Sequence, residues 1–124
     1  MSALLKYKPT PAEVLTKATL NAARLLGLSN AELAQVLRTS AASVSRLGSA
    51  TRLIDPEGYE GKCALMLVKI FRALDLLVGG DAEARMAWMG AHNKALRGVP
   101  HERILDVEGI VFTLNYLNGM KGAT

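Results

Sequence analysis

Apolar residues recur at helical spacing along almost the whole chain, and each such stretch ends at a residue that stops a helix. In residues 12–26 they lie three and four positions apart, and Gly27 then ends the stretch. The apolar face predicted for this first helix is Val14, Leu15, Ala18, Ala22, Leu25 and Leu26. Ser29 and Glu32 form a capping box for the next helix. No segment shows the alternation of a convincing strand, so we predict an all-α fold.

The second and third predicted helices are short and close together, separated only by Arg38, Thr39 and Ser40. Ala34 is small enough for a close crossing, and Ser40 can cap a helix that runs from Ala41 to Leu47. The residues predicted to pack inward are Leu33, Ala34, Val36, Leu37, Val44 and Leu47. The outward face of the third helix is then Ala41, Ala42, Ser43, Ser45 and Arg46. This pattern predicts a helix-turn-helix whose second helix enters the major groove of DNA.

Serine hydroxyls and arginine guanidinium groups can contact base edges or phosphates. The candidate DNA-binding residues are Arg38, Ser40, Ser43, Ser45, Arg46 and Arg52. Arg38 stands where such turns usually hold glycine. Either the turn differs here, or the arginine is strained in exchange for a phosphate contact. The alternative for the whole segment is a helical hairpin in a bundle without DNA binding.

The charge of the chain favours the DNA interpretation. Residues 1–52 carry a net charge of +5, whereas residues 53–124 carry −1, within a total of +4. A basic first half beside a nearly neutral remainder indicates a polyanionic partner for the first half.

The second half begins after a segment rich in turn formers, residues 48–60, which includes Pro56 and Gly58. We place a domain boundary there and predict domains at residues 1–58 and 59–124. A long central helix is predicted over 60–78, with Leu65, Ile70 and Leu77 widening its apolar face. Asp81 caps a helix that runs to about Met89, a loop covers 90–101, and a last helix runs from Val107 to about Leu117. Asn118-Gly119 is expected to end that helix.

Several classes of protein are excluded or disfavoured by composition. Cys63 is the single cysteine, so the chain cannot form an internal disulfide, and it is expected to be a buried apolar residue. The chain shows no apolar leader, and Lys69, Arg72 and Asp75 interrupt its most apolar stretch, so we expect a cytoplasmic protein without a membrane span. No catalytic motif, metal-ligand cluster or cofactor signature is present, and His101 is expected in a solvated helix start.

Two sets of motifs together resemble a known family. Residues 33–47 are similar to the Xre-like helix-turn-helix of bacterial repressors. The second half resembles the toxin-binding domain of the Xre/MbcA/ParS antitoxins, which carries a tryptophan, an Asn-x-x-Leu-x-Gly-x-Pro loop and a glycine in the last helix. The matching residues are Trp88, Asn93, Leu96, Gly98, Pro100 and Gly109. They look like shaping residues, with Gly98 permitting a positive φ.

The resemblance implies an antitoxin that represses its own operon through upstream operator DNA and forms a homodimer. It also implies a RES-domain toxin as partner, which degrades NAD or ADP-ribosylates a target, and whose active site the antitoxin covers. The residues expected to touch the toxin project beyond the shaping residues: Arg97, Asn115, Asn118, Met120 and Lys121. Two alternatives remain: a stand-alone repressor whose C-terminal half only dimerises, and a structural helical bundle.

Overall fold

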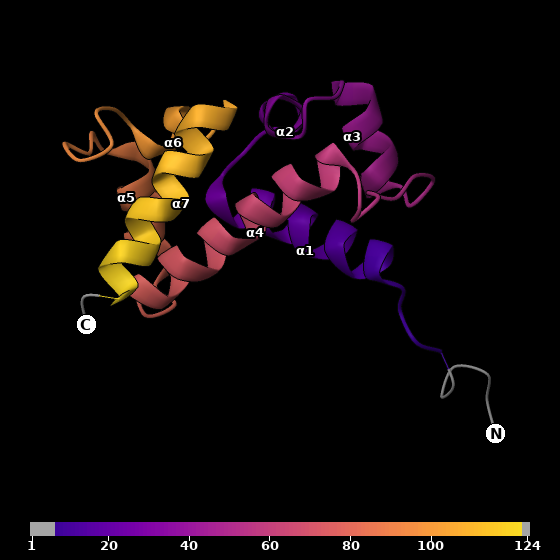
Figure 1. Cartoon of the computed structure of the whole chain (residues 1–124), viewed down its shortest axis with the longest axis horizontal. Coiled ribbons are helices and arrows are strands. Elements are labelled where there is room, and N and C mark those ends of the chain that lie inside the picture. Colours follow the sequence, from indigo (N-terminus) through magenta and orange to yellow (C-terminus); the bar gives the residue numbers. More distant parts are fainter. Residues whose placement is uncertain (1–6, 123–124) are drawn as a thin grey trace.

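The computed structural model describes the backbone of residues 7–122 and the side chains of residues 7–120, and confirms the all-α fold. That part of the chain holds seven helices and no strand (Figure 1). The helices are α1 (Pro11–Leu26), α2 (Asn30–Leu37), α3 (Ala41–Gly48), α4 (Tyr59–Leu77), α5 (Ala82–Gly90), α6 (Pro100–Arg103) and α7 (Val107–Gly122). None of them is long and apolar enough to cross a membrane.

Local hydrogen bonds fix where most helices begin. Ser29 and Glu32 form the expected capping box at α2, and the hydroxyl oxygen of Ser40 accepts from the backbone N–H of Ser43 at α3. Asp81 caps α5 as expected. At the other end of α1, Gly27 adopts φ 81°, the left-handed conformation that glycine takes most easily. Because these signals are local, the sequence was sufficient to locate them.

The buried face of α1 differs from the predicted one. Val14 is 56% exposed, whereas Thr16 and Thr19 are buried with Ala22, Ala23 and Leu26. Burial of the threonines is possible because both hydroxyls have partners. Thr16 Oγ1 accepts from the backbone N–H of Ile54 at 2.9 Å, and Thr19 donates to the carbonyl of Leu15 at 2.7 Å. The prediction considered only apolar residues and therefore left out the threonines. The predicted buried face of α1 was consequently displaced around the helix from the observed one.

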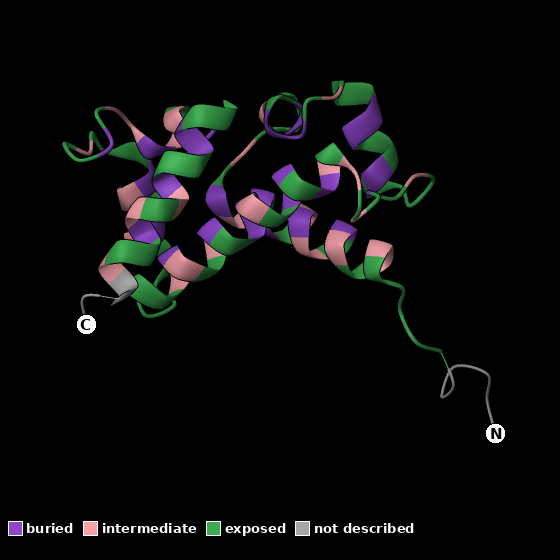
Figure 2. Ribbon diagram, in the orientation of Figure 1, coloured by how far each residue is buried: buried purple, intermediate pink, exposed green. Residues whose placement is uncertain are grey.

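Helix α4 is the centre of the molecule and packs against α1, α2 and α7. Ala64, Leu67, Ile70 and Leu74 are completely buried on it, as Figure 2 shows by the purple bands along this helix. The prediction that Leu65, Ile70 and Leu77 widen the buried face of α4 is wrong in part, because Leu65 and Leu77 are exposed. One side of α4 therefore remains open, and its exposed stripe includes Leu76.

Two polar contacts join the C-terminal helices to α1 and α2. Arg85 of α5 is buried and donates from Nε to the carbonyl of Leu25 at 3.0 Å, while its Nη1 pairs with Asp75 at 3.2 Å. His101 of α6, expected in a solvated helix start, lies 2.6 Å from Glu32 of the α2 capping box. The two halves are thus in direct contact.

Helix α7 starts as predicted but ends later. The carboxylate of Asp106 accepts from the backbone N–H of Gly109 at 2.7 Å. The helix then continues to Gly122 instead of ending near Leu117. A glycine inside a helix costs only about 1 kcal/mol. Packing of α7 against α4, which buries Leu117, is sufficient to carry the helix past Asn118-Gly119.

Candidate functional site

The turn between α2 and α3 keeps its left-handed residue although that residue is an arginine. Arg38 adopts φ 61° and ψ 44°, and the backbone N–H of Thr39 reaches the carbonyl of Ala34 at 2.9 Å. A left-handed conformation costs a residue with a Cβ roughly 1–2 kcal/mol. The sequence left open whether the turn differs or the arginine is strained, and the structure has the strained arginine. The side chain of Arg38 is exposed.

The outward face of α3 is smaller than the sequence predicted. Ala41, Ala42, Ser45 and Arg46 are exposed, but Ser43 is only 7% exposed. Ser43 lies four residues before the buried Leu47 and therefore on the inward side of the same helix. The expectation that Ser43 faces outward is corrected. Arg46 is the one long side chain on this face.

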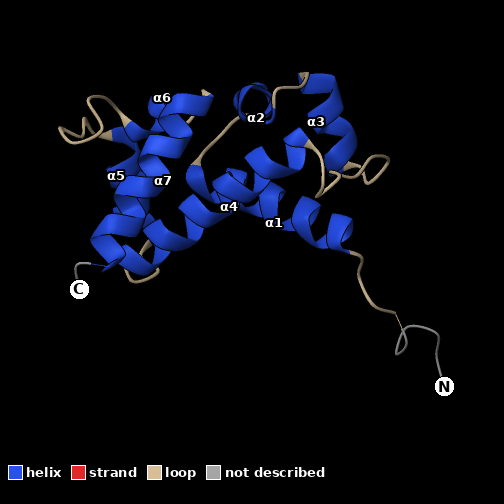
Figure 3. Ribbon diagram, in the orientation of Figure 1, coloured by secondary structure: helices blue, strands red, loops and turns tan. Residues whose placement is uncertain are grey.

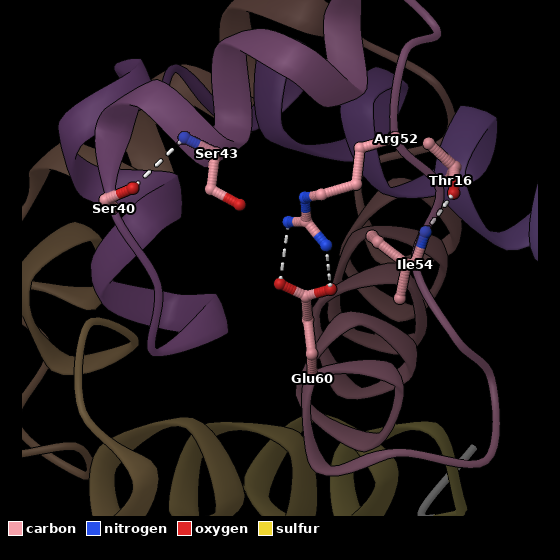
Figure 4. A network of polar contacts seen from close by, with 6 residues as sticks. All are labelled: Thr16, Ser40, Ser43, Arg52, Ile54 and Glu60. Carbon is pink, nitrogen blue, oxygen red and sulfur yellow. Dashed lines mark hydrogen bonds and ion pairs between the residues drawn. The ribbon is translucent and has the colours of Figure 1, made fainter.

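Arg52 lies in the connector between α3 and α4, drawn as a loop in Figure 3, and it is bound in an ion pair. Its Nη1 and Nη2 donate to the two carboxylate oxygens of Glu60 at 2.8 and 2.9 Å (Figure 4). These hydrogen bonds raise the pKa of Arg52 above its usual value. Arg52 was expected to be free for a phosphate, whereas Glu60 compensates its charge and ties the connector to α4.

The first candidate surface therefore consists of exposed residues around the helix-turn-helix. Of the six residues expected to bind DNA, four are exposed at the turn and on α3: Arg38, Ser40, Ser45 and Arg46. The side chain of Ser40 already accepts the capping hydrogen bond from Ser43. Arg38 and Arg46 supply the positive charge that a phosphate backbone needs.

The second candidate surface is the outer face of α7. Val111, Phe112, Asn115 and Asn118 are exposed and lie three or four residues apart, so they share one side of the helix. Phe112 is 47% exposed, which is unusual for a phenylalanine. Sequence analysis named Asn115 and Asn118 on this side but neither Val111 nor Phe112. The spacing of both residues from Asn115 was the signal that could have placed them here.

The loop between α5 and α6 is shaped by its own hydrogen bonds. Asn93 and Gly98 pair through both backbone groups at 2.8 and 3.2 Å, and the side-chain oxygen of Asn93 accepts from Leu96 N–H. The positive φ expected at Gly98 occurs at Arg97 instead, with φ 57°. A Cβ at Gly98 would lie 3.2 Å from Cδ of Arg103, so that side chain would have to shift slightly.

The residues expected to touch the toxin do not form one cluster. In Figure 1 the loop between α5 and α6, which carries Arg97, lies beside α6 at one end of the C-terminal helices. The last turns of α7 lie at the opposite end of these helices. Arg97, Asn115 and Asn118 are exposed, and Met120 is half-buried. The side chain of Lys121 lies outside the described residues. Asn115 and Asn118 thus share a surface with Phe112, and Arg97 is separate from the end of α7.

Titratable side chains form no metal-binding group among the residues that the structure describes. No set of three histidine, cysteine or acidic residues comes together there. Cys63 is buried as expected, and desolvation raises the pKa of its thiol.

Comparison with protein families assigns both halves of the chain. Residues 7–60 match the antitoxin Xre-like helix-turn-helix domain, and residues 73–122 match the antitoxin Xre/MbcA/ParS C-terminal toxin-binding domain. A search among curated proteins gave no match. The two matches occur in the order of the two surfaces described above, one around α2 and α3 and one that includes α7. The chain therefore belongs to the Xre/MbcA/ParS antitoxins, with a helix-turn-helix for DNA and a C-terminal domain for a toxin.

Proposed function

We propose that this antitoxin neutralises a RES-domain toxin that degrades NAD, by covering the active site of the toxin, and that it represses its own promoter as a homodimer. The division into a DNA-binding domain of residues 1–58 and a toxin-binding part of residues 59–124 belongs to this proposal. The antitoxin itself acts by binding and performs no catalysis.

The exposed face of α7 carries the proposal on the toxin side. Phe112 and Val111 are apolar groups left in water within the domain that matches a toxin-binding family. Aromatic side chains are the residues that most often anchor protein interfaces. Asn115 and Asn118 lie beside them and can form hydrogen bonds that orient the partner. Arg97 adds a positive charge, which suits a cleft built for a phosphate-bearing dinucleotide.

The exposed arginines carry the proposal on the DNA side. Arg38 lies just before α3 and Arg46 lies in its last turn, on a helix that would meet phosphates and base edges if it is a recognition helix. Ser40 at the N-cap of α3 and Ser45 within α3 add exposed hydroxyls. Arg52 can take part only if a phosphate competes with Glu60, and Ser43 only if α3 shifts, so both stand as weaker candidates.

The experiment that tests this proposal measures growth and cellular NAD in a host that expresses the neighbouring open reading frame, with and without this chain. We expect the neighbour to stop growth and deplete NAD, and this chain to restore both. Growth arrest and rescue without loss of NAD would contradict the NAD-degrading toxin. A harmless neighbour would instead support a stand-alone repressor whose C-terminal half only dimerises.

Point variants locate the toxin contact better than truncation does. Removing residues 115–124 would also delete the buried Leu117 and so disturb the core. Phe112→Ser changes an exposed side chain and is expected to abolish protection. Leu76→Ser is the matched control, because Leu76 is exposed on α4. Equal protection by both variants would contradict a contact through α7.

A further inference from the structure

An apolar groove runs along α1, on a part of the DNA-binding half that neither proposed function uses. It has a volume of about 1070 Å³ and is lined by residues from Tyr7 to Arg24, which include most of α1, and by the end of α3 and the connector that follows. Its lining includes Tyr7, Val14, Ala50 and Leu53, and also the buried Leu47. The groove is open to solvent.

The exposed apolar residues of the DNA-binding half are concentrated in this groove. Between residues 7 and 58, three large apolar side chains are exposed: Tyr7 at 58%, Val14 at 56% and Leu53 at 43%. All three line the groove. Single apolar residues on a surface are ordinary, whereas a contiguous group of them marks an interaction site. Sequence analysis placed Val14 in the core, so the structure alone reveals this surface.

We propose that this groove is the surface through which two copies of the chain dimerise. The inference rests on the proposed homodimer and locates its interface. Glu13 and Lys17 both line the groove, four residues apart on α1. In a two-fold interface each patch faces its own copy, so a patch with both signs of charge can pair Glu13 of one copy, whose carboxylate also accepts from Tyr7 and from Thr10 N–H, with Lys17 of the other. A polyanion would gain nothing from the apolar lining.

The position of the groove suits an antitoxin dimer. It lies at the end of the molecule away from α5, α6 and α7 (Figure 1), so a second copy there leaves the α7 face open for the toxin. Arg46 is the one long side chain on the outward face of α3. A single copy can therefore read few bases, and two copies would bring two recognition helices to two half-sites.

The test is the mass of the full-length chain in solution, measured by sedimentation or light scattering over a range of concentrations. The double variant Val14→Glu, Leu53→Glu places charges in the groove, at positions that tolerate them in the monomer because both are exposed. Leu76→Glu places a charge on a leucine of α4 that is even more exposed, at 66%, and is the matched control. Circular dichroism verifies that all three proteins are folded.

We expect wild type and Leu76→Glu to have twice the 13.3 kDa mass of one chain. The double variant should be a monomer, with a dissociation constant raised about thirtyfold or more, as for loss of an interface hot spot. It should still protect cells from the toxin.

Three results would overturn the inference. A monomeric wild type would refute both the homodimer and its interface. A dimeric double variant would refute only the location of the interface. A double variant that stays dimeric and loses protection would assign the groove to the toxin.

Discussion

At the scale of single residues, two positions show how backbone geometry selects a side chain. Gly109 cannot be replaced by a residue with a side chain without a backbone shift, because a Cβ there would lie 1.7 Å from the carbonyl oxygen of Arg103. Arg38 is the opposite case, since its left-handed backbone would suit glycine better than arginine. We infer that the first residue is kept for packing and the second for its charge.

Gly109→Ala should therefore destabilise the protein by at least about 1–3 kcal/mol, as overpacking does. Gly119 is the matched control on the same helix, because no atom lies within 4 Å of the Cβ that it would gain. Gly119→Ala should stabilise the protein by about 0.5–1 kcal/mol through its helix propensity. Urea unfolding monitored by circular dichroism measures both, and equal effects of the two substitutions would contradict the close contact.

Arg38→Gly should separate stability from DNA binding. Relief of the left-handed strain is expected to stabilise the fold by about 1 kcal/mol. Loss of a phosphate contact should weaken DNA binding and reduce the slope of log K against log salt by about 1. Unfolding and DNA titrations at several salt concentrations give the two results. Unchanged affinity would show that Arg38 does not touch the DNA.

At the scale of elements, α3 and α7 carry the two candidate surfaces. Each exposes one side and buries the other, and each is positioned by α4 or by a helix packed on it. The inward residues of α3 were predicted correctly except Ser43, because Val44 and Leu47 are strongly apolar. The outward side of α7 was predicted less well, because valine and phenylalanine are apolar residues that this helix leaves exposed.

Substitution of Arg46 should affect only one of these surfaces. Arg46→Ala removes the long exposed side chain of α3 and should weaken DNA binding by about 1–3 kcal/mol. Toxin neutralisation should remain, because α7 is unchanged. Electrophoretic mobility shifts and growth protection measure the two activities. Loss of protection by a folded Arg46→Ala protein would contradict the separation of the two surfaces.

At the scale of the whole molecule, long-range polar contacts tie the halves together. Arg85 connects α5 to the end of α1 and to α4, and its guanidinium also lies 5.6 Å from the ring centre of Phe71. The carboxylate of Glu32 serves two elements, since it accepts from Ser29 N–H in the capping box and contacts His101 of α6.

Substitution of Arg85 tests the contacts that this residue makes with α1 and α4. Arg85→Met fills similar space but leaves the carbonyl of Leu25 and the carboxylate of Asp75 without this partner. We expect a loss of about 1–3 kcal/mol, the usual cost of a buried polar group that loses its hydrogen bond. Asp75→Asn should cost less, because the side chain of Asp75 is 40% exposed. Equilibrium unfolding of both variants makes the comparison, and an Arg85→Met protein as stable as wild type would contradict the tie.

The contact between Glu32 and His101 predicts that the stability of the protein depends on pH. The hydrogen bond from Ser29 N–H, followed by the contact with His101, lowers the pKa of Glu32 below its usual 4.5. A carboxyl group with a lowered pKa stabilises the fold above the unfolded pKa, and this stabilisation is lost as the pH falls through the folded pKa. Wild type should therefore lose stability relative to Glu32→Gln as the pH falls from about 5 to 3. Thermal unfolding across this range measures the difference, and parallel curves would contradict it.

The sequence by itself determined the helix boundaries that depend on local hydrogen bonds: the capping box of Ser29, the caps of Ser40 and Asp81, and the stop at Gly27. It also determined the two family motifs, because these too are local patterns. The tertiary structure decided which side of each helix is buried, the partners of Arg52, Arg85 and His101, and the length of α7. These features depend on residues far apart in the chain. A satisfied threonine can replace a leucine in the core, and packing can carry a helix through a glycine, so no local pattern could predict them.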